Sequence, residues 1–260
     1  CEIVSLDSTP VPRGEDNLVY ASAKHLYEVC GVPFRGLKIG QINNIPFARG
    51  LGSSSACVIG GLKGANHLMG NPVSDDELIN LAAGIEGHPD NSTPALTGGL
   101  VTAVIDRGRV YYVKQEIRGN LHFVAIVPDF ELKTSLARSV LPDAVSRQDG
   151  VFNLSRAALM SVSLYSGNYR NLRVAADDRL HQPYRLGLIR GGAEVMELCY
   201  SLGAYAAFIS GAGSTIMAIV DAALPDFGGC ISRHLPGLGL DGWQVHTLSI
   251  DNIGTVVETE

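Results

Sequence analysis

The chain has 260 residues, of which 46% are hydrophobic and 18% are charged, so it can bury the cores of two domains. A formal net charge of −6 argues against broad nucleic-acid binding, because no basic stripe is available for a phosphate backbone. No stretch reaches the roughly 18 consecutive apolar residues of a membrane span. Five scattered cysteines without a C-x-x-C pair indicate reduced thiols and a cytoplasmic protein, not a disulfide framework or a zinc site.

Apolar periodicity predicts the elements of the first half. Alternation indicates strands at residues 1–6, 37–42, 100–105 and 110–114. Helical spacing indicates helices at residues 18–30, 56–69 and 75–86. The third helix carries a capping-box signature, Ser74 with Glu77. Residues 87–99 are polar and turn-rich, and we expect a loop there.

The second half mixes strands and helices without strict alternation. Strands are predicted at residues 123–127, 205–209, 216–220 and 243–248. Two or three helices are expected within 153–203, and a weaker one within 222–234. We therefore predict an α+β fold without an internal repeat, divided near Arg118-Gly-Asn120 into domains at residues 1–118 and 119–260.

The most informative segment is Pro46-Phe-Ala-Arg-Gly-Leu-Gly-Ser-Ser-Ser-Ala56, between a strand-like and a helix-like stretch. Its glycines let the backbone turn and let an anion approach the amides. A helix that begins at the serines directs unpaired N–H groups and the positive end of its dipole toward that anion. The segment therefore indicates a phosphate site; a Gly/Ser turn that only caps a helix is the alternative.

This loop lacks the Gly-Lys-Ser/Thr ending of a Walker A motif. A serine hydroxyl at the helix start can instead ligate Mg²⁺ or bond a phosphate oxygen. Mg²⁺ prefers oxygen ligands and usually takes one or two carboxylates. Glu86, at the end of a following helix, is a candidate ligand, and a solvated helix-end acid is the alternative interpretation.

Three spaced motifs carry a family resemblance over essentially the whole chain. They are Gly50-Leu-Gly-Ser-Ser-Ser-Ala, Glu86-Gly-His-Pro-Asp-Asn91 with Pro94-Ala-Leu-x-Gly-Gly99, and Ser210-Gly-Ala-Gly-Ser-Thr215. In this order they resemble the signature of the GHMP kinase superfamily. The His-x-Asp-Asn-x-x-Pro-Ala run and Leu136-Ala-Arg-x-x-Leu-Pro142 resemble its homoserine kinase branch. The resemblance implies an ATP cleft between an N-terminal α+β domain and a C-terminal ferredoxin-like α+β domain.

The same resemblance implies a site for ATP and Mg²⁺. The loop would wrap the triphosphate, Asn17 matches a position that contacts the nucleoside, and Ser54 and Glu86 would hold the metal ion. The family usually has a small residue where Arg49 stands, so this cation either adds to the phosphate site or points to solvent. The implied cofactor-binding residues are Asn17, Pro46, Arg49, Gly50, Leu51, Gly52, Ser53, Ser54 and Ser55.

The implied acceptor is L-homoserine, a zwitterion whose carboxylate needs a cation. Arg138 and Arg185 match the family's substrate-side arginines, and a guanidinium grips a carboxylate with two parallel hydrogen bonds. Surface ion pairs are the alternative for both. Thr134 matches a polar position near the transferred phosphoryl group.

Asp90 and Asn91 are expected to orient the acceptor. Phosphoryl transfer has a loose transition state, so positioning and charge neutralisation can supply most of the rate, and a base role for Asp90 stays open. His88 either binds substrate or braces its loop. The expected catalytic residues are Asp90, Asn91, Thr134 and Arg138, and the substrate-binding residues are His88, Asp90, Arg138 and Arg185.

The expected reaction transfers the γ-phosphoryl group of ATP to L-homoserine, in threonine biosynthesis, in a homodimer with no nucleic-acid or membrane partner. A mevalonate or phosphomevalonate kinase is one alternative, and an inactive nucleotide-binding sensor of this fold is another.

Residues 1–45 hold no counterpart of the family's opening Pro-x-Ser-Ala-Asn stretch, and we expect a working enzyme whose first segment is missing from this sequence. Ser214 replaces a usual proline, and the loop 210–215 is expected to back the phosphate site with little effect on the reaction.

Overall fold

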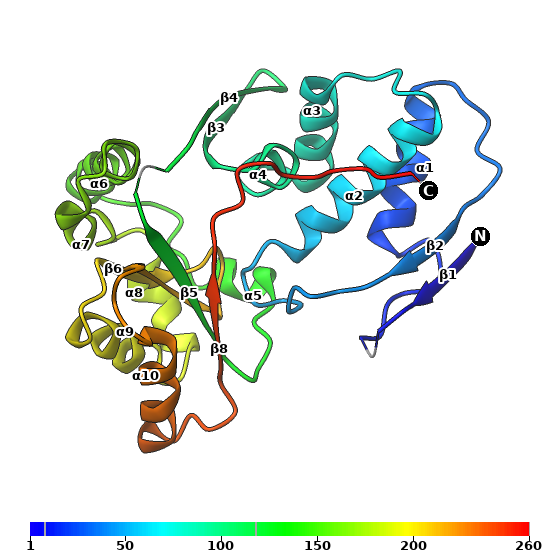
Figure 1. The fold of residues 1–260 in the computed structure, drawn as a ribbon. Helices are drawn as coiled ribbons and strands as arrows, with labels where there is room; N and C mark the ends of the chain where they lie inside the picture. The colour runs from blue at the N-terminus through cyan, green and yellow to red at the C-terminus, as the bar shows by residue number, and fades with distance from the viewer. Residues whose placement is uncertain (8, 118, 260) are drawn as a thin grey trace. The chain divides into compact units, whose positions relative to one another are not determined.

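The computed structural model describes residues 1–259 except residues 8 and 118 (Figure 1). Its internal contacts divide the chain into two compact units. Unit 1 comprises Cys1–Pro46, Gly52–Gln115 and Asp251–Glu260, and unit 2 comprises Phe47–Leu51 and Glu116–Ile250. Both units are discontinuous in sequence, unlike the two continuous domains that we predicted. Residue 118, at the predicted boundary, lies outside the described residues, and that boundary stays a prediction.

Unit 1 combines helices with two small sheets. Its helices are α1 (Leu18–Val29), α2 (Ser53–Leu68), α3 (Asp75–Glu86) and α4 (Ser92–Thr97). Its strands are β1 (Glu2–Ser5) and β2 (Lys38–Gln41), which pair in parallel, and β3 (Leu100–Asp106) and β4 (Arg109–Gln115), which form an antiparallel hairpin. The strands and the three long helices are the elements that periodicity predicted.

The helices of unit 1 pack through one apolar cluster. Leu26 of α1, Ile59 and Leu62 of α2, and Leu78 and Ile79 of α3 are fully buried in it. Burying each of these side chains contributes about 1.5–3 kcal/mol. The cluster therefore fixes α2 and α3, the two helices that carry the predicted phosphate and metal residues.

Two local features of unit 1 bear on the sequence predictions. The capping box is confirmed, because the Ser74 side chain accepts from the Glu77 N–H and the Glu77 carboxylate accepts from the Ser74 N–H. The prediction of a loop over residues 87–99 is wrong for Ser92–Thr97, which form α4. Pro94 lies in the first turn of that helix, where its missing N–H costs no hydrogen bond.

Residues 251–255 return to unit 1 after the chain has completed unit 2. The Gly99 N–H donates to the carbonyl of Asp251 at 2.7 Å. Thr255 donates its N–H to Leu96 O at 3.1 Å and its hydroxyl to Ala95 O at 2.8 Å. This segment is therefore part of the packing around α4.

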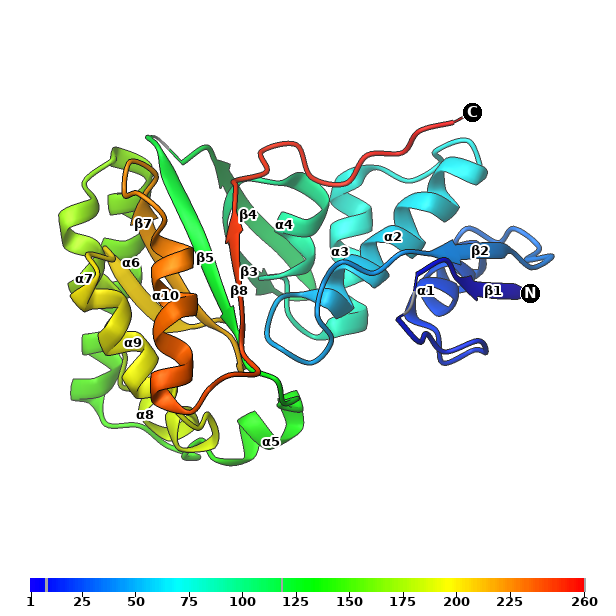
Figure 2. The same cartoon turned by 60° about the horizontal axis from the view of Figure 1, so that its bottom comes forward.

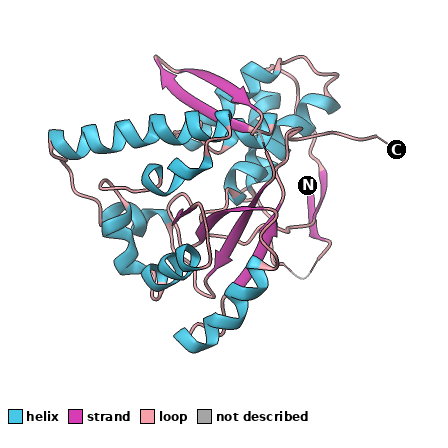
Figure 3. Ribbon diagram, turned by 60° about the vertical axis from the view of Figure 1, so that its left-hand side comes forward, coloured by secondary structure: helices cyan, strands magenta, loops and turns pink. Residues whose placement is uncertain are grey.

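Unit 2 is built on a four-stranded antiparallel sheet (Figure 3, magenta). Its strands are β5 (Leu121–Val127), β6 (Ala206–Ile209), β7 (Ile216–Asp221) and β8 (Gln244–Leu248), in the order β6-β7-β5-β8. Its helices are α5 (Thr134–Ser139), α6 (Arg147–Ser166), α7 (Leu172–Ala175), α8 (Gln182–Arg185), α9 (Gly192–Ser201) and α10 (Phe227–His234). This order and the helices between strands give the ferredoxin-like arrangement, so the predicted α+β fold is confirmed.

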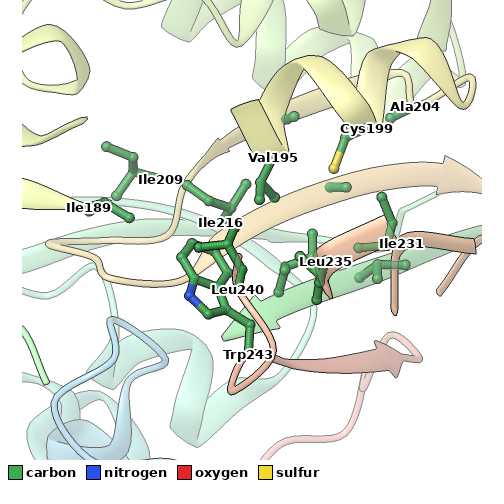
Figure 4. Packing of buried hydrophobic residues seen from close by; sticks show 14 of the residues in the cluster. Ile189, Val195, Cys199, Ala204, Ile209, Ile216, Ile231, Leu235, Leu240 and Trp243 are labelled. Atoms are coloured by element: carbon green, nitrogen blue, oxygen red, sulfur yellow. The ribbon is translucent and has the colours of Figure 1, made fainter. Parts of the chain in front are cut away.

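Helices α9 and α10 cover the sheet of unit 2: α9 packs on β6 and β7, and α10 packs on β8 (Figure 2). Figure 4 shows Val195 and Cys199 of α9 and Ile231 of α10 in the same apolar cluster as Ile216 and Trp243. Burial raises the pKa of the Cys199 thiol to about 12, so this thiol stays protonated and serves the packing. Within the described residues, no helix is both long and apolar enough to cross a bilayer.

Candidate active site

The serines of the first glycine loop lie in the opening turn of α2. Gly52 precedes this helix with a φ of 74°, a left-handed conformation that glycine adopts without strain, and no side chain caps the helix. The N–H groups of Ser53, Ser54 and Ser55 belong to a first turn, which has no helical acceptors for them. The turn therefore offers donors and a positive dipole end to an anion.

Glu86, at the last residue of α3, is brought to this turn. The Ser55 hydroxyl is buried and donates to Glu86 Oε2 at 2.6 Å, whereas Ser54 is exposed. Sequence analysis associated Glu86 with Ser54, but the direct contact is with Ser55. Successive helical residues point about 100° apart, and sequence spacing alone does not say which serine faces α3.

A cavity of about 290 Å³ lies beside the start of α2 in unit 1. The segment from β2 to Ile45 and the helices α1 and α2 line it, with Ser53 and Cys57 among the lining residues. Burial raises the pKa of the Cys57 thiol. The side-chain amide nitrogen of Asn43, another lining residue, is buried and has no partner among the described residues. It is therefore a free donor at the wall of a cavity sized for part of a small ligand.

Residues 39–45 were not among the predicted site residues. The signal that was available is the run Gln41-Ile-Asn-Asn44, which follows a strand and places amide side chains just before the glycine loop. Their backbone is anchored: the Asn43 N–H donates to the Asp7 carboxylate, and this hydrogen bond holds the pKa of Asp7 below its ordinary value.

Asn17 has another role in the structure. It is the N-cap of α1, and its side-chain oxygen accepts from the N–H groups of Val19 and Tyr20. Its side-chain nitrogen donates to Pro12 O at 2.9 Å and to Gln41 Oε1 at 2.6 Å. Because Asn17 is buried and its polar atoms are engaged, its predicted nucleoside contact does not enter the function proposed below.

The predicted acceptor residues of unit 1 follow α3 directly. His88 Nδ1 lies 2.8 Å from Asp90 Oδ1, but this nitrogen is buried and makes no hydrogen bond among the described residues. Asp90 remains exposed, and Asn91 is exposed at the N-cap of α4 without a side-chain capping bond. Both side chains are therefore accessible to a ligand.

In unit 2, the second glycine loop packs directly on the first. The Ser210 hydroxyl donates to Gly50 O at 2.7 Å, and the Thr215 N–H donates to Arg49 O at 3.1 Å. Gly50 has a φ of 75°, and a Cβ there would lie 2.1 Å from Ser210 O. Only glycine fits this approach. The expected backing of the loop around Gly50 by residues 210–215 is thus present.

Arg49 is turned into unit 2 and is only 15% exposed. Its guanidinium donates to the carbonyls of Phe47 and Pro128 at 3.1 Å each and to Asp129 O at 3.4 Å. It lies 4.0 Å from the Glu131 carboxylate. The side chain therefore fastens residues 47–49 to the connection after β5, a role that neither predicted alternative included.

Arg185 links two parts of unit 2. Its Nε donates to Ala137 O of α5 at 3.1 Å, and its Nη1 donates to Gly211 O of the second glycine loop at 3.0 Å. Burial lowers the pKa of Arg185, and the nearby Arg138 lowers it further. Arg138 and Thr134 are exposed and lie one turn apart on α5.

Arg138 and Arg185 have no acidic partner among the described residues. Over the part of the chain that the structure describes, no carboxylate lies within ion-pair distance of Arg138 or Arg185. Within this part of the chain, the surface ion pairs that were the alternative for both arginines are therefore not formed. Two neighbouring positive guanidinium groups repel each other, and a bound anion would relieve this repulsion. The surface around them therefore favours an anionic ligand.

The comparisons with known proteins place this chain in the GHMP kinase family. Residues 17–99 match the model of the GHMP kinases N terminal domain, and residues 160–227 match that of the GHMP kinases C terminal domain. The chain belongs to this family and is an ATP-dependent kinase, which confirms the predicted resemblance and enzyme class.

Its relatives include homoserine kinases. The chain is 46% identical over 246 residues to that of Clostridium beijerinckii, covering 94% of this chain and 82% of the relative. It is 43% identical over 254 residues to that of Caldicellulosiruptor saccharolyticus, covering 97% and 82%. The crystal structure of homoserine kinase from Cytophaga hutchinsonii aligns with a TM-score of 0.87 at 26% identity, over 97% of this chain and 83% of that one. Mevalonate kinase of L. major, with a TM-score of 0.68 at 15% identity over 96% and 82%, shares the fold.

Proposed function

We propose that this chain transfers the γ-phosphoryl group of ATP to the hydroxyl of L-homoserine, giving O-phospho-L-homoserine. Relatives with 40–46% identity over 94–97% of the chain bear the name homoserine kinase. The mevalonate kinases reach only 15–16% identity, which supports a shared fold and not a shared acceptor. For an enzyme with the activity that the name homoserine kinase describes, the product is the expected precursor in threonine biosynthesis.

The nucleotide is assigned to unit 1. The first turn of α2 supplies backbone donors for phosphate oxygens, and the adjacent cavity suits a nucleoside. The buried amide of Asn43 supplies a hydrogen-bond donor at the cavity wall. These features support ATP as the donor and add residues 39–45 to the predicted loop.

Magnesium fits the residues at the start of α2. Glu86 offers a half-buried carboxylate, and its Oε2 is held by the Ser55 hydroxyl, so Oε1 is left for an ion. Ser54, exposed in the same turn, supplies a second oxygen. A hard cation takes such oxygen ligands, and bound Mg²⁺ would neutralise charge on the phosphate oxygens. In this assignment Ser55 orients the carboxylate and Ser54 with Glu86 holds the metal.

The acceptor carboxylate is assigned to Arg138 and Arg185, and the observation that carries this step is their lack of a carboxylate partner among the described residues. A guanidinium binds a carboxylate through two parallel hydrogen bonds. Thr134, one turn before Arg138, supplies a hydroxyl at the same end of α5. Arg138 also offers a positive charge to the transferred phosphoryl group.

Asp90, Asn91 and His88 orient the acceptor in this proposal. Asp90 is exposed, so its carboxylate is available for an ammonium or hydroxyl group. Because phosphoryl transfer proceeds through a loose transition state, orientation and charge neutralisation carry the rate and no strong base is required. The hydroxyl proton passes to solvent or to Asp90.

The test is a steady-state assay of the purified chain with ATP and Mg²⁺, comparing L-homoserine with mevalonate and phosphomevalonate. We expect turnover with homoserine alone, detected as ADP release and as O-phosphohomoserine by mass spectrometry. Preference for mevalonate would replace the proposed acceptor. ATP binding by calorimetry without turnover of any of the three would instead favour a nucleotide-binding sensor.

The proposal includes a homodimer as the assembly, on the family expectation alone. Analytical ultracentrifugation at micromolar concentration should give a mass near 55 kDa, about twice the 27.6 kDa of one chain. A species with the mass of a single chain at this concentration would refute the dimer and leave the kinase proposal intact.

A further inference from the structure

Arg185 stands on a very short helix that cannot hold its own position. Helix α8 spans only Gln182–Arg185, and isolated helices of this length are unstable. The guanidinium direction therefore depends on how the residues before α8 are fixed. Three sets of contacts fix them, all within unit 2.

The first set is centred on Asp178, whose side chain is 7% exposed. One carboxylate oxygen accepts from the N–H groups of His181 at 2.7 Å and Gln182 at 2.6 Å, which are the unpaired donors at the start of α8. The other oxygen accepts from the side-chain amide of Asn153 on α6. Burial alone raises the pKa of Asp178, but the hydrogen bonds from Gln182, His181 and Asn153 outweigh it and the net pKa is lowered.

The second set ties the same segment to α6. The Asn153 side-chain oxygen accepts from the Arg179 N–H at 2.9 Å, so one asparagine grips both residues 178 and 179. The Arg179 guanidinium lies over the Phe152 ring, 3.9 Å from its centroid, and 3.4 Å from the Asp149 carboxylate. The long helix α6 thus serves as the support for the segment before α8.

The third set joins α8 to the sheet. Gln182 is buried, accepts from the Ile209 N–H at 2.9 Å and donates to Ala176 O at 3.0 Å. Ile209 ends β6 immediately before the second glycine loop, whose Gly211 O receives Arg185 Nη1. The Arg185 N–H donates to His181 O at 3.0 Å. A shift at Asp178 therefore reaches the guanidinium through two residues.

We propose that Asp178, held by Asn153, is a positioning residue that aims Arg185 at the acceptor carboxylate. The inference rests on the assignment of Arg185 made above. Asp178 also places a negative charge near the Arg185 guanidinium, whose pKa this charge raises against the effects of burial and of Arg138. This charge offsets the repulsion between Arg185 and Arg138 without occupying the guanidinium, since no ion pair with Arg185 is formed among the described residues.

The test compares Asp178→Asn with a matched control. Asn keeps the size of the side chain but turns a donor toward Asn153, so the segment shifts and the homoserine KM should rise about tenfold, while the ATP KM changes less than about twofold. Asp251→Asn is the control, because Asp251 also accepts from two backbone N–H groups, of Ile253 and Gly254, in unit 1. It should leave both KM values unchanged.

A second pair of variants separates positioning from mere folding. In the double variant Asn153→Asp with Asp178→Asn, the amide at residue 178 can donate to the carboxylate at residue 153. This restored hydrogen bond should return the homoserine KM to within about threefold of the wild type. Asn153→Ala leaves both backbone hydrogen bonds of Asp178 in place and should raise the homoserine KM by about threefold. This variant carries the test on the same criterion if Asp178→Asn does not fold.

The outcomes that overturn the proposal are specific. A folded Asp178→Asn, or Asn153→Ala, with an unchanged homoserine KM refutes it, and so does an equal rise in both KM values. A wild-type chain that does not phosphorylate homoserine refutes the proposed function instead. The two failures are thus distinguished by the wild-type assay.

Discussion

The two glycine loops have nearly the same composition and different surroundings. The first, at residues 50–55, opens a 16-residue helix, and its serines lie in a turn with unpaired N–H groups and one hydroxyl on Glu86. The second, at 210–215, leads into β7, and its Ser214 and Thr215 are fully buried. Its Ser210 hydroxyl serves Gly50 rather than a ligand. The first loop is followed by a helix and the second by a strand, and this difference distinguishes the loop proposed to bind phosphate from the loop that supports it.

The largest effect is expected at the acid that the first loop contacts. Glu86→Ala removes the carboxylate proposed for Mg²⁺ and should lower kcat about 100-fold, with partial recovery as free Mg²⁺ is raised. Rates measured across a Mg²⁺ titration test this. Glu77→Ala on the same helix is the control, since it loses only the capping box. A Glu86→Ala enzyme with the wild-type Mg²⁺ dependence would contradict the metal role.

Arg185 lies against the second loop and provides the next test. Arg185→Leu should raise the homoserine KM by about 10- to 100-fold and leave the ATP KM nearly unchanged, because the lost guanidinium is assigned to the acceptor carboxylate. Arg233→Leu is the matched control, an exposed arginine paired with Asp226. Equal increases in both KM values for Arg185→Leu would remove this residue from the acceptor site.

The contact between the loops is tested by two glycines with the same backbone conformation. Gly50 and Gly52 have φ values of 75° and 74°, but only at Gly50 would a Cβ meet backbone, at 2.1 Å from Ser210 O. Gly52→Ala should cost about 1 kcal/mol from backbone strain, and Gly50→Ala about 2–4 kcal/mol. Denaturant unfolding measures both. Equal losses would mean that the close approach to Ser210 is not maintained in solution.

The smallest effect is expected at the supporting loop itself. Ser210→Ala removes the 2.7 Å hydrogen bond to Gly50 O and should destabilise the chain by about 1 kcal/mol. Turnover should stay within about threefold of the wild type, because residues 210–215 support the first loop and bond no ligand in this scheme. A larger fall in kcat with unchanged stability would give the second loop a direct part in the reaction.

Much of the fold could be predicted because local signals agree with the tertiary packing. The capping box at Ser74 and Glu77, the hairpin around Asp106 and the apolar spacing of α2 all reappear in the structure. These signals depend on neighbours within a few residues. Helix α4 differs from the predicted loop because the polar, turn-rich composition of residues 87–99 hides a short helix, in which Pro94 is compatible with the first turn.

The site was harder to predict because it depends on contacts between residues far apart in sequence. Which serine meets Glu86 depends on the rotation of α2 against α3, and the role of Arg49 depends on carbonyls about 80 residues away. The cavity wall at residues 39–45 carries no motif that spacing alone identifies. Asn17 illustrates another difficulty. The family resemblance matches it to a position that contacts the nucleoside, but in the structure its side chain caps the start of α1.

The return of residues 251–255 to α4 has a consequence for biosynthesis. The partners at Leu96 and Gly99 leave the ribosome roughly 150 residues before Asp251 and Thr255 do. All four strands of unit 2 have therefore been synthesised while unit 1 still lacks the hydrogen bonds made by residues 251–255. During translation, the unit that is mostly synthesised first is the one that is completed last.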